Sequence, residues 1–367
     1  MDYKIDKRIV LTLDVGGTNL VFSAVQGMKE IVEPIRLKTY PNDLDKCLEN
    51  LLSGFNQIID KLDSKPVAIS FAFPGPADYP NGIIGTPPNV PAFHNVALGP
   101  FLENNFKIPV FINNDGDLFV YGEAMAGFLP KVNDMLEKAS SPKKFHKLFG
   151  ITLGTGFGGG LVADGKLYVG DNSASGEIWI TRNKRHPKCF AEEGVSIRAV
   201  KGTYARIAGI DASEAPEPKD ISAIAQGTQD GNQEAAKTAF AELGEVVGDA
   251  LANAITLLDG LIVVGGGLSN AYPLFINSIL DQMNGTIESY SGEKLPRIVQ
   301  KSFDLENDNS CQQFIKGEVK DIVVPGTDKI VKYDSLKRIG IGRAVLDTSY
   351  AISVGAYAFA LSQLDSK

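Results

Sequence analysis

Three glycine-rich turns, each placed directly after an apolar run, constrain the fold of this sequence most. They read DVGGTN (14–19), LGTGFGGG (153–160) and VVGGGLS (263–269). Glycine lets backbone N–H groups approach a ligand closely, and successive N–H groups in such a turn form a concavity that suits phosphate. Each turn alone fits an ordinary hairpin or strand end, but the three in this order indicate phosphate binding. A P-loop is excluded, because G-x-x-x-x-G-K-[ST] is absent.

The first two turns mark two similar halves of the chain. Apolar runs flank each turn, which predicts two glycine-turned hairpins, and LTLD (11–14) and ITLG (151–154) hold the same place in them. A length of 367 residues also favours two domains. Strands that alternate with helices in each half predict an α/β protein with two sheet domains and a cleft between them. We expect one domain from 1–114 plus 346–367, and a larger one from 115–345.

The remaining pattern predicts individual elements. We expect helices at 44–62, 117–127, 240–258 and 349–361, strands at 67–73, 108–112 and 261–264, polar connections at 131–148 and 211–220, and a hairpin at 320–334. Asp117 is the expected N-cap of the second helix. The third glycine turn is expected to lead into a helix whose positive end faces a nucleotide.

Composition excludes several classes of protein. The net charge is −8, which argues against a nucleic-acid or anionic-membrane protein. The three cysteines lie far apart in sequence, which excludes a disulfide framework, and no run reaches the ~18 apolar residues of a membrane span. A cytoplasmic location is the expected one, with a small molecule as the binding partner.

Two aspartates supply the candidate chemistry. Asp14 follows an apolar strand and precedes the first turn, where a carboxylate beside phosphate calls for a cation, and water-bridged Mg²⁺ is the natural one. Asp115 lies where a strand ends and a helix begins, so it can take a proton from a hydroxyl group that attacks a phosphoryl group. The alternatives are that Asp14 caps its turn and that Asp115 caps its helix.

Several segments together resemble the ROK family of sugar kinases, within the hexokinase and actin-like ATPase superfamily. The matching segments are LTLDVGGTN, FPGPAD, TPPNVPAFHNVAL, INNDGDLFVYGE, ITLGTGFGGGLV, SGE, EEGVS, DGNQEA and LDGLIVVGGGLS. The resemblance spans about residues 9–300 and the closing helix. It implies two ribonuclease-H-like domains, each a mixed sheet with flanking helices, and ATP-dependent phosphorylation of a hexose at its 6-hydroxyl group, with glucose as the default.

The resemblance also implies roles for single residues. Asp115 would be the catalytic base. The nucleotide residues would be Asp14, Gly16, Gly17, Thr18, Asn19, Thr155, Gly156, Gly265, Gly266 and Gly267, with Asp14 near Mg²⁺. The sugar residues would be Gly75, Asn89, Asn114, Asp115, Glu177 and Glu192. Glu192 is preferred to Glu193 because it lies four residues before Ser196, as the family pattern has it. Since the two glutamates are adjacent, the choice between them stays open.

One region departs from the family pattern. Many members have G-E-x-G-H followed by C-x-C-G-x-x-G-C, whose histidine binds zinc and contacts the sugar. Here Trp179 and Ile180 replace the glycine and histidine, and Cys189 is the one cysteine of the region. Because a tetrahedral zinc site needs four ligands, we predict no structural zinc.

Alternatives to a glucose kinase are kept open. The substrate can be fructose, mannose, N-acetylglucosamine or N-acetylmannosamine, because pocket shape reads the substituent at C2. A non-catalytic protein that binds sugar or ATP is a further alternative. A regulator of the same family would carry an N-terminal DNA-binding domain, for which the first strand, beginning near residue 9, leaves no room. Family members often dimerise, so a homodimer is also considered.

Overall fold

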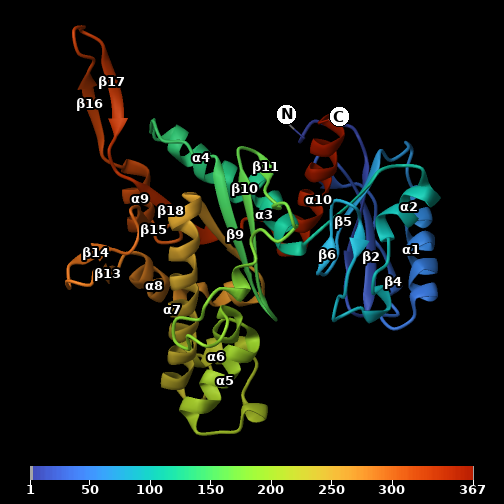
Figure 1. Ribbon diagram of the computed structural model, residues 1–367, viewed down its shortest axis with the longest axis horizontal. Coiled ribbons are helices and arrows are strands. Elements are labelled where there is room, and N and C mark those ends of the chain that lie inside the picture. Colours follow the sequence, from blue (N-terminus) through green and yellow to red (C-terminus); the bar gives the residue numbers. More distant parts are fainter. Residues whose placement is uncertain (1–2, 367) are drawn as a thin grey trace. The chain divides into compact units, whose positions relative to one another are not determined.

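Three stretches of the chain build the first of two structural units in the computed structural model, which describes residues 3–366 (Figure 1). This first unit consists of the described residues of Met1–Gly127, Gly160–Gly176 and Val345–Lys367, and the second consists of Phe128–Gly159 and Glu177–Ala344. Residues 1, 2 and 367, at the ends of the first predicted domain, lie outside the described residues.

The first unit contains a mixed sheet in the order β3-β2-β1-β5-β8, with β4 paired to β2. Its strands are β1 (Val10–Val15), β2 (Asn19–Gln26), β3 (Lys29–Glu30), β4 (Ile35–Lys38), β5 (Ala68–Ala72) and β8 (Val110–Asn113). β1 and β2 are antiparallel with Asp14 opposite Val21, which confirms the first glycine-turned hairpin. β5 is parallel to both β1 and β8, so these three strands end at the same edge of the sheet.

Helices cover both faces of this sheet. α1 (Leu44–Ile59) and α2 (Leu98–Phe106) bury apolar side chains against one face, where the rings of Phe22 and Phe55 meet edge to face at 5.0 Å. α10 (Thr348–Asp365) packs against β1, β5 and β8, and α3 (Asp115–Met125) packs on α10 (Figure 1). A short ribbon of β6 (Ala77–Asp78) and β7 (Ile83–Ile84) completes the unit. β10 (Phe157–Ala163) begins in the second unit, and its end pairs with β11 (Lys166–Leu167) in the first.

Two glycines let α3 and α10 approach each other closely. A Cβ atom added to Gly355 would lie 1.9 Å from the carbonyl oxygen of Leu118, and one added to Gly122 would lie 2.0 Å from that of Ala351. Backbone therefore packs directly on backbone at this crossing. α3 thus belongs to the first unit, whereas the sequence pattern predicts residues 115–127 in the larger domain; the predicted domain boundaries stay a prediction.

The second unit contains four parallel strands in the order β9-β12-β18-β15. They are β9 (Lys147–Leu153), β12 (Leu261–Gly265), β18 (Arg338–Arg343) and β15 (Lys301–Asp304). Its helices are α4 (Phe128–Lys138), α5 (Ile197–Ala208), α6 (Pro218–Gln226), α7 (Gln233–Leu258), α8 (Tyr272–Met283) and α9 (Asp308–Lys316). α5, α6 and α8 all pack against the long helix α7.

Two antiparallel hairpins extend from the second unit (Figure 1). One joins β13 (Thr286–Glu288) to β14 (Lys294–Pro296), and the other joins β16 (Val319–Val323) to β17 (Ile330–Asp334), which confirms the hairpin expected at 320–334. At the base of the second hairpin, the Arg338 guanidinium forms a buried ion pair of 2.5 Å with Asp334.

Three expectations about single elements are wrong. Residues 128–138 form helix α4 rather than a polar connection, because Phe128, Val132 and Leu136 recur at helical spacing and are buried. The segment 211–220 is likewise not all loop, since α6 begins at Pro218, a favoured first helical residue. Asp117 is not the cap of α3: the Asn114 side chain accepts from the backbone N–H of Gly116, so the helix begins two residues earlier.

Candidate active site

The predicted sugar and phosphate residues of the first unit gather at one edge of its sheet. Asp14 is the last but one residue of β1, Gly75 follows β5, and Asn114 and Asp115 follow β8 directly. Since these three strands are parallel, their carboxyl ends lie at the same edge. Asn89 is exposed in the loop after β7. The sheet therefore positions the candidate residues through its strand ends.

Thr39 supports the first glycine turn through two hydrogen bonds. The hydroxyl group of this buried threonine donates to the carbonyl oxygen of Gly16 at 2.6 Å, and its backbone N–H donates to that of Thr18 at 3.1 Å. The turn is closed by the N–H of Gly16, which donates to the carbonyl oxygen of Asn19 at 2.9 Å. Gly17, Thr18 and Asn19 remain exposed and available to a ligand. No sequence pattern identified Thr39, because it lies on a different strand end.

The Asp14 carboxylate has a local environment that suits a cation. Although the residue is exposed, the surrounding protein desolvates its carboxylate, and this burial together with the negative charge of Asp115 raises the pKa of Asp14. The opposing charge comes from Arg36. Asp14 and Arg36 line a cavity of about 490 Å³ within the first unit. A hard, oxygen-binding cation such as Mg²⁺ would offset the negative charge that Asp115 adds near Asp14.

Asp115 is the first residue of α3, and its side chain is exposed. Its Oδ1 atom accepts a hydrogen bond of 2.9 Å from the backbone N–H of Gly116, and Asn114 caps the helix beside it. This bond orients the carboxylate, and no other hydrogen bond to the Asp115 side chain is found among residues 3–366. A carboxylate so held can accept a proton from a hydroxyl group that binds next to it.

In the second unit, the second and third glycine turns are neighbours. β9 and β12 are parallel with Thr152 opposite Gly265, so both turns follow strands that end at the same edge. Gly266 has a φ angle of 82°, and a Cβ atom on it would lie 2.4 Å from the carbonyl oxygen of Leu153. Only glycine fits there. A 3₁₀ turn, Gly267–Ala271, separates these glycines from α8, so the third turn does not open an α-helix directly as expected.

Glu192 lies against the second glycine turn. Its Oε2 atom accepts from the backbone N–H of Phe157 at 3.0 Å, and a Cβ atom added to Gly156 would lie 2.7 Å from it. Glu193 instead pairs with Arg198 at 2.6 Å, while Glu192 lies 3.2 Å from the same guanidinium. No motif in the sequence points to Arg198. The contact with Phe157 supports Glu192 rather than Glu193 as the site residue, and the choice stays a prediction.

Glu177 precedes a short 3₁₀ turn, Ile178–Ile180, which contacts the 3₁₀ turn Ala191–Gly194 that carries Glu192. Its exposed carboxylate accepts a hydrogen bond from the indole N–H of Trp179. Thus the second unit brings together Thr155, Gly156, Glu192 and the third turn along one edge, with Glu177 on an adjoining turn.

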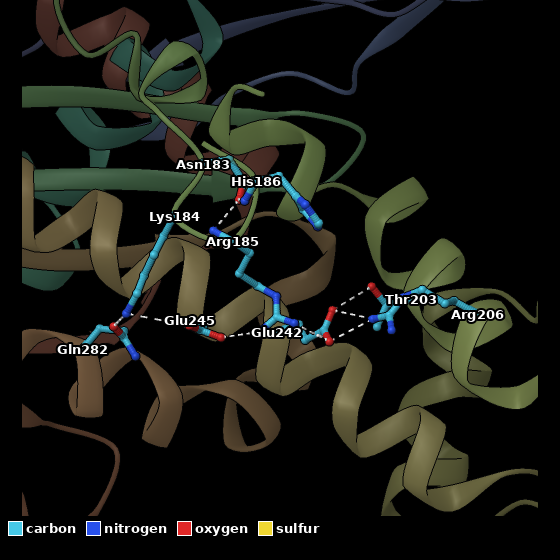
Figure 2. Close-up of polar contacts among 9 residues, drawn as sticks. All are labelled: Asn183, Lys184, Arg185, His186, Thr203, Arg206, Glu242, Glu245 and Gln282. Atoms are coloured by element: carbon cyan, nitrogen blue, oxygen red, sulfur yellow. Dashed lines mark hydrogen bonds and ion pairs between the residues drawn. The ribbon is translucent and has the colours of Figure 1, made fainter. Parts of the chain in front are cut away.

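A network of polar side chains occupies the region where the family pattern has its zinc ligands (Figure 2). The buried Asn183 side chain accepts from the backbone N–H groups of Arg185 and His186 at 2.9 and 3.1 Å. The Arg185 guanidinium bridges Glu242 and Glu245 of α7 at 2.8 and 2.5 Å. Among residues 3–366, no group of three or more histidine, cysteine or acidic side chains is arranged to hold a metal ion. The donor set here does not fit zinc.

We expect this network, not a metal, to stabilise the loop. Replacing Asn183 by alanine leaves two backbone N–H groups without their acceptor and should lower the free energy of unfolding by about 1–3 kcal/mol. The neighbouring substitution Lys184→Ala, at a side chain that is 38% exposed, should alter the free energy of unfolding by less than about 0.5 kcal/mol. Dialysis against a chelator should leave the melting temperature unchanged. One zinc per chain in elemental analysis would contradict the prediction of no structural zinc.

Comparison with known proteins identifies relatives over most of the chain. The family model described as ROK family matches residues 10–311. An N-acetyl-D-glucosamine kinase of Vibrio cholerae is 29% identical over 306 residues, which cover 78% of this chain and 92% of that protein. A crystal structure of a glucokinase from Parabacteroides distasonis is 53% identical with a TM-score of 0.91, and the match covers 99% of both chains.

A more distant structure extends the comparison of folds. A ROK family glucokinase from Streptomyces griseus, solved in complex with glucose and AMPPNP, is 17% identical with a TM-score of 0.58, covering 95% of this chain and 98% of that one. These likenesses confirm the predicted actin-like α/β fold. Within the described residues, no helix combines the length and apolar character that crossing a membrane requires.

Proposed function

This chain belongs to the ROK family, and we propose that it is an ATP-dependent kinase that phosphorylates a hexose at its 6-hydroxyl group. Sugar kinase activity follows from the family and from relatives named for that activity. The observation that carries the finer proposal is the placement of Asp14 and Asp115 at the carboxyl ends of β1 and β8, at one edge of the first sheet, where the charge of Asp115 raises the pKa of Asp14.

We assign the proton transfer to Asp115. Phosphoryl transfer requires little covalent chemistry from the protein beyond positioning, charge stabilisation and orientation of the nucleophile. The other carboxylate oxygen of Asp115 would accept the proton of the 6-hydroxyl group as the oxygen of that hydroxyl attacks the terminal phosphorus of ATP. The bond from the N–H of Gly116 to Oδ1 fixes the carboxylate for this role.

We assign Asp14 to the cation and the glycine turns to the nucleotide. When bound, Mg²⁺ supplies charge neutralisation for the phosphates, and Asp14 would hold it through water. The exposed N–H groups near Gly17 and Thr155 would bind phosphate oxygens, and Gly265, Gly266 and Gly267 would flank the adenosine.

The sugar is assigned to carboxylate and amide side chains. Asn89, Asn114, Glu177 and Glu192, with the backbone of Gly75, would hold the hydroxyl groups, because such groups accept or donate two hydrogen bonds to vicinal hydroxyls. Glucose is the proposed hexose, in line with the 53% identical protein named glucokinase. N-acetylglucosamine is the main alternative, since the Vibrio cholerae relative is named for it. A cytoplasmic location and a homodimer stay predictions.

A panel of hexoses tests the proposal. With ATP and Mg²⁺, we expect glucose to give the highest kcat/KM, at least about tenfold above N-acetylglucosamine, mannose, fructose and N-acetylmannosamine. Phosphorus NMR of the product should show the phosphate on the 6-oxygen. A higher kcat/KM for N-acetylglucosamine would identify this sugar as the substrate in place of glucose and would leave the proposed mechanism unchanged. Absence of turnover with every sugar, despite measurable ATP binding, would indicate the non-catalytic alternative.

A further inference from the structure

Trp179 makes a contact with a proposed sugar residue that the family pattern does not provide. Its indole Nε1–H donates a hydrogen bond to the Oε2 atom of Glu177, and among the described residues no other group donates to this carboxylate. Trp179 is half-buried, while Glu177 is exposed. A glycine at position 179, as in the family pattern, has no side chain that could make this bond.

The indole ring is itself held in place. It meets the Phe190 ring edge to face, with centroids 5.7 Å apart and an interplanar angle of 87°, an arrangement that aromatic pairs favour. Phe190 is fixed in turn, because it forms an isolated β-bridge with Arg182, and the N–H of the next residue, Ala191, donates to the carbonyl oxygen of Thr181 at 2.7 Å. Phe190 therefore contacts Trp179, and Trp179 contacts Glu177, in a continuous series within the second unit.

We propose that Trp179 is a positioning residue for sugar recognition: its indole N–H fixes the Glu177 carboxylate so that the other oxygen accepts a sugar hydroxyl. This inference rests on the proposed function, and specifically on Glu177 as a sugar residue. An indole N–H donates and cannot accept, so it orients the carboxylate without competing for the sugar's donors. A hydrogen bond to an ionised group is also stronger than one between neutral groups.

The decisive variant is Trp179→Phe, which keeps an aromatic ring against Phe190 and removes the N–H donor. With D-glucose, and in parallel N-acetyl-D-glucosamine, we expect the sugar KM and the calorimetric Kd to rise about tenfold. We expect kcat to change less than about twofold, because the reacting atoms are not touched. The KM for ATP and the melting temperature should stay as in the wild type, which separates positioning from a purely structural role.

An exposed aromatic residue outside the site supplies the matched control. Tyr290 lies in the turn between β13 and β14 and is fully exposed, so Tyr290→Phe also removes one polar group from an aromatic side chain and should leave the sugar KM and Kd unchanged. An unchanged sugar KM and Kd in Trp179→Phe would overturn the inference while the kinase proposal stands. If the wild type phosphorylates no hexose, the proposed function fails, but calorimetry still compares sugar affinity between the two proteins. No hexose binding at all would overturn both.

A second measurement needs no variant. Trp179 is the only tryptophan of the chain, so intrinsic tryptophan fluorescence reports on this one position. We expect a saturable change in emission as D-glucose or N-acetyl-D-glucosamine is added, with the same Kd as calorimetry gives. Sugar binding by calorimetry without any change in emission would overturn the proposal, since the indole would then be unaffected by occupancy of its own carboxylate partner.

Discussion

Replacing Asp115 by asparagine is expected to lower kcat for hexose phosphorylation by about 10²–10⁴-fold. The amide cannot take the proton from the attacking hydroxyl, yet its oxygen can still accept from the N–H of Gly116, so the start of α3 should persist. Binding of ATP should be unchanged, because the nucleotide is assigned to other residues. A coupled kinase assay measures kcat, and calorimetry with ATP measures the affinity.

Asp45 offers a matched control for this substitution. It is also an exposed aspartate in the first turn of a helix, α1. Asp45→Asn therefore replaces a carboxylate by an amide at a similar position in its helix. We expect its kcat to equal that of the wild type. Near-normal turnover in Asp115→Asn would remove this residue as the base, and the fold assignment would be unaffected.

The largest effect on stability is expected from Gly355→Ala. The new Cβ atom would lie 1.9 Å from the carbonyl oxygen of Leu118, which is backbone and cannot rotate away as a side chain can. α10 would have to move away from α3, and the buried contacts between the two helices would be lost. We expect a loss of about 3 kcal/mol or more in the free energy of unfolding, or a failure to fold. Chemical denaturation, followed by circular dichroism, measures this free energy of unfolding.

Gly202→Ala is the control, because it makes the same substitution within another helix, α5. A Cβ atom there would meet nothing within 4 Å, so the change should raise the free energy of unfolding by about 0.5–1 kcal/mol through the lower backbone entropy of alanine. Opposite signs for the two variants are the expected result. A stability of Gly355→Ala equal to that of the wild type would mean that α3 and α10 do not cross so closely.

Local patterns predicted much of the fold. The hairpin around Gly16 and the ribbon at 320–334 follow from alternating residues on either side of a turn, and the long helix α7 from its apolar spacing. The start of α3 was missed because Asn114, Asp115 and Asp117 are all acceptable caps by residue type. α4 was missed because its polar content and the nearby Pro142 outweighed three buried apolar positions.

Contacts between distant residues could not be predicted. Thr39 supports the first glycine turn from 23 residues away, and Glu192 reaches the backbone of Phe157 across 35 residues. No periodicity encodes such pairs, because each depends on how strands and loops meet in three dimensions. The sequence did indicate which residue types the site needs, through Asp14, Asp115 and the glycine turns, but not the partners that hold them.

The position of α10 in the first unit bears on how the chain folds as it is made. This helix packs against β1, β5 and β8, yet it follows them in the sequence only after the whole second unit. One face of the first sheet therefore stays exposed to water throughout translation, while every residue of the second unit precedes α10 and can fold first. Maturation of this sheet thus depends on synthesis of residues 348–365, and a nascent chain that stops before them leaves an apolar surface that chaperones would bind.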